Sequence, residues 1–195
     1  MSQSAQADFL LETRGTSHDL GAFVVAARFS HDGRRVGFAL GDGTVRLATV
    51  GSPEPWTEIT THDGAILDFA EDPAGNGFIS AGDDGKLNRV AADGTVSTLG
   101  DFGMKWVEHV ATYALDKGRG LIAASAGKIV RLFDQSGQIL KTLTHPSTVT
   151  GLVFDGKGKR IGASHYNGAS LWFVAAKTDT PRKLEWKGSH TGIII

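Results

Sequence analysis

A repeat of about 40 to 45 residues limits the folds open to this chain more than any other feature. An apolar run that ends in phenylalanine stands before a polar, glycine-containing turn at Phe29, Phe69 and Phe154, so the successive gaps are 40 and 85 residues. The larger gap has room for one more copy, "VATYALDKGRG", with Ala114 at the phenylalanine position. Self-similarity at a fixed spacing is the sequence signature of a repeat architecture.

Histidines that precede these apolar runs show the same period independently. They are His18, His62, His145 and His190, and they are separated by 44, 83 and 45 residues. Because two unrelated residue types have the same spacing, the period belongs to the fold and not to one motif.

Each period contains four short apolar pieces. In the first they are "FVVAARF", "RVGFAL", "TVRLATV" and "PWTEI", and in the third "VATYAL", "LIAASA", "KIVRLFD" and "QILKTL". The pieces are rich in Val, Ile, Leu and Phe and are bounded by Gly, Asp, Asn or Pro, which is typical of strands joined by hairpin turns. No long run has helical periodicity. The sequence therefore predicts an all-β chain in which each period is a four-stranded antiparallel sheet.

Composition excludes several classes of partner. The 195 residues have a formal charge of -1, so no general positive field attracts nucleic acid or an anionic membrane. No apolar run has the roughly 18 residues of a membrane span, and the start lacks a signal-peptide pattern. The chain has no cysteine, which removes disulfides and thiolate metal sites and fits a reducing compartment. We expect a cytoplasmic protein that binds neither nucleic acid nor membrane.

The repeats resemble those of the WD40-repeat β-propellers, whose blades have Gly-His near the start and Trp-Asp near the end of the third strand. The histidine is kept in "SHDLG", "THDGA", "THPST" and "SHTGI", with Ser or Thr in place of glycine. No repeat has Trp followed by Asp, although Phe133-Asp134 comes close. The resemblance implies a WD40-like propeller with degenerate repeats of the bacterial type.

This resemblance implies a single propeller domain over residues 1–195, with blades near 15–60, 61–100, 101–143 and 144–186. Segment 8–14 is then expected to be an outer strand that closes the ring, and 187–195 to open a fifth repeat. Since WD40 rings mostly have seven or eight blades, we expect a C-terminally truncated chain that lacks about three repeats. Two chains could instead complete a ring as a homodimer.

The resemblance also implies a buried hydrogen-bond network in each blade. In such networks the aspartate of the turn between the second and third strands binds the histidine before the first strand, and a hydroxyl on the second strand joins them. In the second repeat these residues are His62, Ser80 and Asp84, and in the fourth they are His145, Ser164, Asn167 and Trp172. Gly43, Gly85 and Gly168 are expected to have the positive φ of a tight hairpin.

No motif indicates catalysis. Three His-Asp pairs, at His18, His31 and His62, lie in predicted turns, and the signatures of zinc hydrolases, nucleophile elbows and phosphate loops are missing from the sequence. We therefore expect no catalytic residue, no metal and no cofactor. The alternative is a propeller enzyme of the hydrolase or lactonase type, with carboxylate and histidine ligands from several blades at the mouth of the central channel.

Recognition of a protein partner is the function that we expect, because loops on a rigid propeller vary freely. On the face of the histidine-containing turns the candidates are Lys105, Trp106 and Tyr166, since exposed aromatic residues dominate interface energies. The other interpretation of Trp106 is that it fills the vacant histidine position of its blade. On the opposite face, basic turns would bind an acidic partner. Their candidate residues are Arg34, Arg35, Lys159 and Arg160.

Overall fold

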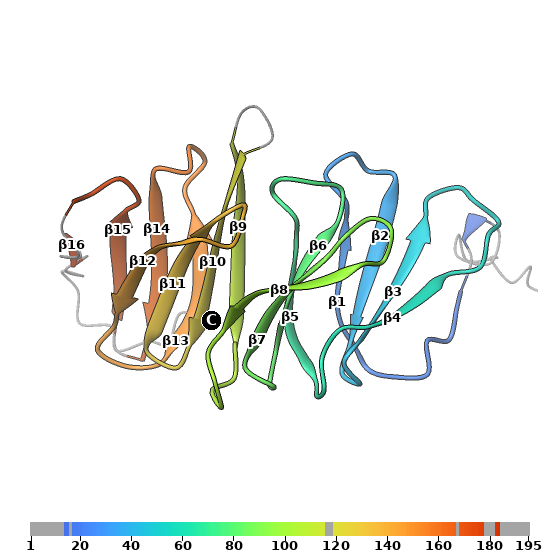
Figure 1. The fold of residues 1–195 in the computed structure, drawn as a ribbon, viewed down its shortest axis with the longest axis horizontal. Coiled ribbons are helices and arrows are strands. Elements are labelled where there is room, and N and C mark those ends of the chain that lie inside the picture. Colours follow the sequence, from blue (N-terminus) through green and yellow to red (C-terminus); the bar gives the residue numbers. More distant parts are fainter. Residues whose placement is uncertain (1–13, 16, 116–118, 167, 178–181, 184–195) are drawn as a thin grey trace, which may run out of the picture.

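The chain folds into four antiparallel sheets that follow one another along the sequence (Figure 1). The computed structural model describes residues 14–15, 17–115, 119–166, 168–177 and 182–183. All 16 elements in these residues are β-strands. This confirms the predicted all-β class and its four-stranded sheets, although the last strand of the fourth sheet has only two residues. Within the described ranges no helix is long and apolar enough to cross a membrane.

Each sheet is a meander of consecutive strands. The first contains β1 (Val24–Phe29), β2 (Arg35–Leu40), β3 (Thr44–Thr49) and β4 (Thr57–Thr60). The second contains β5 (Ile66–Glu71), β6 (Phe78–Gly82), β7 (Lys86–Val90) and β8 (Val96–Asp101). The third contains β9 (His109–Leu115), β10 (Arg119–Ala126), β11 (Ile129–Asp134) and β12 (Ile139–Thr144). The fourth contains β13 (Val149–Phe154), β14 (Arg160–His165), β15 (Gly168–Phe173) and β16 (Arg182–Lys183). We call these sheets blades 1 to 4.

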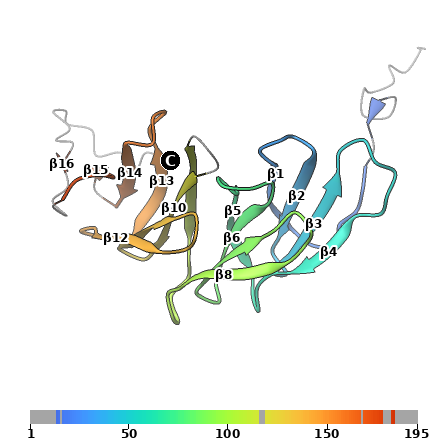
Figure 2. The same cartoon turned by 45° about the horizontal axis from the view of Figure 1, so that its top comes forward.

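The blades form a row and pack face to face. The first strands of successive blades contact each other, β1 with β5, β5 with β9 and β9 with β13. Blades 1 and 4 lie at opposite ends of the row in both views (Figures 1 and 2). The described residues therefore have a propeller-like arrangement of blades in an open row.

Three apolar clusters hold the row together, one between each pair of neighbouring blades. Blades 1 and 2 share a cluster that includes Val45, Phe69 and Phe78. Ile79 and Ile122 belong to the cluster between blades 2 and 3, and the cluster between blades 3 and 4 is formed by side chains of the same kind. Because alternate residues of a strand point to opposite faces, both faces of blades 2 and 3 are apolar and buried.

The two terminal predictions fall mostly outside the described residues. Segment 187–195, the predicted start of a fifth repeat, lies entirely outside them, as do residues 8–13 of the predicted closing strand. The last residue of that predicted strand, Arg14, is described and is not in a strand.

Glycines shape the turns between the second and third strands. Gly43 and Gly85 have φ of 83° and 81°, as a tight hairpin requires, and Gly127 has a φ of 56° in blade 3. The prediction for Gly168 is wrong. The turn of blade 4 has two residues where those of blades 1 and 2 have three, so Gly168 already belongs to β15 and pairs with His165.

Candidate interaction face

Loops and turns from all four blades form a continuous hydrogen-bonded surface along one edge of the row. The segments before the first strands alternate there with the turns between the second and third strands. We call this surface the belt. It consists of residues 17–23, 41–43, 61–65, 83–85, 102–108, 127–128, 145–148 and 166.

Backbone hydrogen bonds connect neighbouring parts of the belt across the blade boundaries. The amide of Thr61 donates to the Gly43 carbonyl at 2.9 Å, and the amide of Val107 donates to the Gly82 carbonyl at 3.0 Å. The His145 amide donates to Lys128 in the same way, at 2.9 Å. Each loop between two blades is thus fixed by the blade before it, and these parts of the belt form one surface and not a set of independent loops.

In blade 2 the three predicted network residues are connected by hydrogen bonds. His62 is buried, its Nδ1 lies 2.9 Å from Asp84 Oδ1, and its Nε2 lies 3.0 Å from Ser80 Oγ. With the proton on Nδ1, His62 donates to the carboxylate and accepts from the hydroxyl. Gly82 makes room for the ring, since a Cβ there would lie 2.3 Å from His62 Nδ1. This arrangement fixes the loop before β5 to the turn between β6 and β7.

Asp84 is ionised in this network. Burial raises the pKa of its carboxyl, but the hydrogen bonds from His62 and from the backbone amide of Lys86 outweigh burial and leave the pKa below its ordinary value. The second carboxylate oxygen accepts the amide of Asp63 at 3.2 Å. The charge therefore serves to hold the loop.

Blade 4 has a different network from the predicted one. The Trp172 indole donates to Nε2 of the buried His145 at 3.1 Å. Ser164 does not belong to this network, because its side chain lies on the other face of β14 and its hydroxyl is 3.0 Å from that of Thr150. Ala163 has the position in β14 that Ser80 has in β6, and it is buried in the cluster with Trp172. Asn167 lies outside the described residues.

His145 is neutral in this environment. Burial lowers the pKa of its imidazole, and the neighbouring His165, with ring centroids 6.1 Å apart, acts in the same direction. Since Nε2 accepts from Trp172, the proton is on Nδ1. No group among the described residues accepts that proton.

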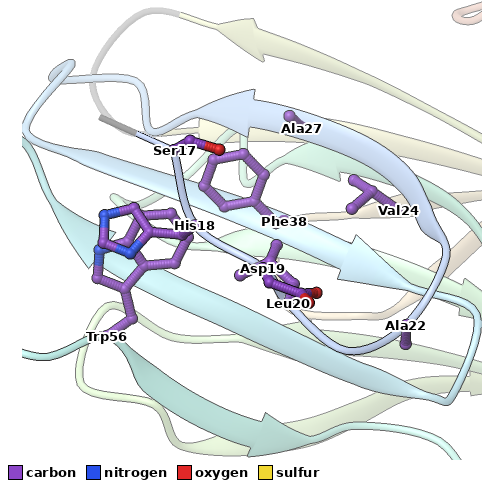
Figure 3. A pocket seen from close by; sticks show the side chains of 9 residues that line it. All are labelled: Ser17, His18, Asp19, Leu20, Ala22, Val24, Ala27, Phe38 and Trp56. Atoms are coloured by element: carbon purple, nitrogen blue, oxygen red, sulfur yellow. The ribbon is translucent and has the colours of Figure 1, made fainter. Parts of the chain in front are cut away.

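Blade 1 has stacked aromatic rings where blade 2 has its network. Phe38 has the sheet position that Ser80 has in blade 2, and it stacks on Trp56 at 5.1 Å. The His18 ring also packs against Trp56, in a tilted arrangement with ring centroids 4.5 Å apart (Figure 3). Ala39 and Leu40, which follow Phe38 in β2, are buried against other residues of the fold.

Trp106 is exposed and does not fill the vacant histidine position of blade 3. Its side chain is 61% exposed, and the next residue, Val107, is fully buried in the cluster between blades 2 and 3. The first interpretation of Trp106, as an exposed aromatic residue at a loop, is the one that the geometry fits. Ser125, on β10, is buried with no hydrogen-bond partner among the described residues.

The loop that contains Trp106 is anchored at both ends. Phe102 and Val107 are buried, and their amides donate to the carbonyls of Gly85 and Gly82 at 2.8 and 3.0 Å. Between these anchors Gly103 has a φ of 67°, and Met104 and Trp106 point to solvent together with Lys105. An apolar pair held outward by a fixed backbone loses little conformational entropy when a partner covers it.

Four large apolar side chains are exposed on the belt. Tyr166 was predicted from the sequence as Trp106 was, whereas Phe23 and the fully exposed Met104 were not. The signal for Met104 was an apolar residue between Gly103 and Lys105, inside an otherwise polar turn. The belt thus offers apolar contacts in blades 1, 3 and 4.

The opposite edge of the row carries charges of both signs. Arg34 and Arg35 lie at the turn between β1 and β2, and Lys159 and Arg160 at the turn between β13 and β14, in the upper part of Figure 1. Arg160 is 3.6 Å from Asp155.

The first of these turns has a carboxylate of its own. Asp32 accepts from the Ser30 hydroxyl and the Arg34 amide, which lowers the pKa of this exposed carboxyl. The basic candidate residues are therefore interspersed with the ionised carboxylates of Asp32 and Asp155, which reduce the positive field around them.

No group of three or more histidine, aspartate or glutamate side chains in the described part of the chain could hold a metal ion. The cluster that the alternative of a propeller enzyme requires is thus not found among these residues.

Comparisons with known proteins give no assignment. No family model matches the chain, and no curated protein matches it at a significant level. The functional argument therefore depends on the geometry of the belt.

Proposed function

We propose that this chain is a non-catalytic protein-interaction scaffold of the WD40-repeat type, and that it binds its protein partner through the belt. The observation that carries the proposal is the anchored loop with Met104 and Trp106. Aromatic side chains and methionine are enriched at protein interfaces, and tryptophan is prominent among the residues that contribute most to binding. Here both are exposed while the residues on either side are fixed.

The kinship with WD40 repeats is supported by the His62 network of blade 2. Its bonds run from a histidine before the first strand to a hydroxyl on the second strand and to the aspartate of the next turn. The four-stranded blades in sequence order are a second support. Blades 1 and 4 replace the network by other contacts, as expected for degenerate repeats.

Photo-cross-linking in living cells tests the proposal. A photoreactive phenylalanine derivative replaces Trp106 in one variant and Ser97, an exposed residue of the outer strand β8, in the control. We expect a defined protein to be cross-linked from position 106 and not from position 97. The same cross-linked products from both positions, or none from position 106, would contradict the proposal.

A further inference from the structure

The two faces at the ends of the row show what a neighbouring blade would cover. We call the face of a blade that points to the next blade in sequence its following face, and the face that points to the previous blade its preceding face. Within the chain, every interface joins the following face of one blade to the preceding face of the next. Two such faces have no neighbour of this kind among the described residues, the preceding face of blade 1 and the following face of blade 4.

Equivalent residues show how far the face of blade 1 departs from an occupied one. Val24, Ile66 and Val149 each begin the first strand of a blade, and each precedes the same irregularity in the strand pairing. Ile66 and Val149 are 1% exposed because the preceding blade covers them, whereas Val24 is 41% exposed. A second pair repeats the contrast. Phe154 packs on the cluster shared with blade 3, but its equivalent Phe29 is 61% exposed.

The following face of blade 4 shows the same kind of difference. Leu47, Leu132 and Leu171 occupy equivalent positions of the third strand, opposite Gly37, Ala123 and Gly162. Leu47 and Leu132 are buried against the next blade, whereas Leu171 is only half-buried. Val153, on the same face, is 63% exposed.

The preceding face of blade 1 also has space for side chains of a neighbour. Segment 17–22 covers only part of it and leaves a pocket of about 490 Å³, with Val24, Ala27 and Phe38 along its strand side (Figure 3). The pocket lies where the side chains of a preceding blade would pack.

We propose that a second copy of this chain occupies these faces, with blade 4 of one copy packed on blade 1 of the other. This contact continues the three interfaces already present within the chain, because it joins a following face to a preceding face. It is heterologous, so it closes into a ring if the rotation between copies permits and otherwise adds further copies. Exposed apolar faces of this kind favour association.

The molar mass of the purified 195-residue chain, measured by light scattering, tests this inference. We expect a mass of at least two chains. Val24→Asp on blade 1 and Val153→Asp on blade 4 should each reduce it to that of one chain. Phe29→Ser is a second, milder variant of the blade 1 face, and circular dichroism checks that each variant remains an all-β protein.

Mixing the two aspartate variants distinguishes this contact from others. Each variant keeps the face that the other has lost, so we expect the mixture to form a two-chain species. A monomeric wild-type chain would overturn the inference and would favour coverage by further blades of a longer chain. The inference would also be overturned if both aspartate variants kept the wild-type mass. The control is the double variant Ile139→Lys with Leu140→Lys on the exposed outer strand β12, and a result in which this control gives monomers while the aspartate variants do not would overturn the inference too.

Discussion

Two turn aspartates at equivalent positions, Asp84 and Asp42, have different surroundings. Asp84 bonds the buried His62 and the amide of Asp63, both from another segment, whereas the bonds of Asp42 go to Thr44, the first residue of the adjoining strand β3. We predict that Asp84→Ala lowers the free energy of unfolding by about 1.5–3 kcal/mol, the usual loss for a hydrogen bond to a charged group. Asp42→Ala should cost clearly less. Denaturant unfolding of both variants measures the difference, and equal losses would contradict the role of the network.

His145 should make the stability of the chain depend on pH. Burial lowers the pKa of its imidazole below the ordinary value of 6.5. Between the lowered value and 6.5 the unfolded chain binds more protons than the folded chain, so the free energy of unfolding decreases as the pH falls through this range. His145→Gln has no titratable proton, and we predict that it reduces this decrease. Denaturant unfolding at several pH values between 5 and 8 is the measurement; an unchanged slope in the variant would refute the assignment.

In the turns, the residue type determines the backbone conformation most directly, and Gly85 is the clearest case. Its φ is 81°, and a Cβ would lie 1.8 Å from the Gly103 carbonyl oxygen. Gly33 has a similar φ of 68° but open space around it. We predict that Gly33→Ala costs about 1–3 kcal/mol of stability through backbone strain alone. Gly85→Ala should cost more, because it also displaces the Trp106 loop. Thermal unfolding of both variants measures the two losses of stability. A smaller loss for Gly85→Ala than for Gly33→Ala would contradict the close packing of Gly85 against the Trp106 loop.

Most strands and turns could be predicted from the sequence, because apolar runs and glycine turns are local features. The partners of individual side chains could not. Ser164 was assigned to the wrong face because a shift of one residue reverses the side of a strand. The spacing contained a signal, since Ser80 precedes Asp84 by four residues and Ser164 precedes Asn167 by only three. That difference places Ser164 one residue before the end of β14, whereas Ser80 stands two residues before the end of β6. The shorter turn of blade 4 accounts for the error at Gly168.

The exposure of Trp106 could not be predicted either. Two neighbouring residues, Trp106 and Val107, are both apolar, and only the packing between blades 2 and 3 determines which one is buried. A strand pattern fixes such a choice by alternation, but a loop has no period.

At the scale of the whole molecule, the row of blades behaves as a nearly one-dimensional array. Each blade packs on its neighbours through one apolar cluster, and the belt adds hydrogen bonds at every boundary. In such arrays stability is close to a sum of blade and interface contributions. We propose separate roles for the belt and the end faces, the first in binding a partner and the second in association between copies.

The belt and the opposite edge of the row are competing candidates for partner binding. The belt has anchored apolar side chains, whereas the basic residues of the opposite edge are accompanied by Asp32 and Asp155. Charges at an exposed rim mainly alter association rates, while buried aromatic contacts dominate affinity.

The affinity of the protein cross-linked at position 106 tests the central claim most directly. Calorimetry compares the wild-type chain with a belt variant, Met104→Ala with Trp106→Ala, and with a charge-reversal variant, Arg34→Glu, Arg35→Glu, Lys159→Glu and Arg160→Glu. We predict that the belt variant raises Kd by about 30-fold or more, the equivalent of losing one hot-spot residue worth about 2 kcal/mol, and that charge reversal changes Kd little. A Kd that rises with charge reversal and is unchanged in the belt variant would contradict the account.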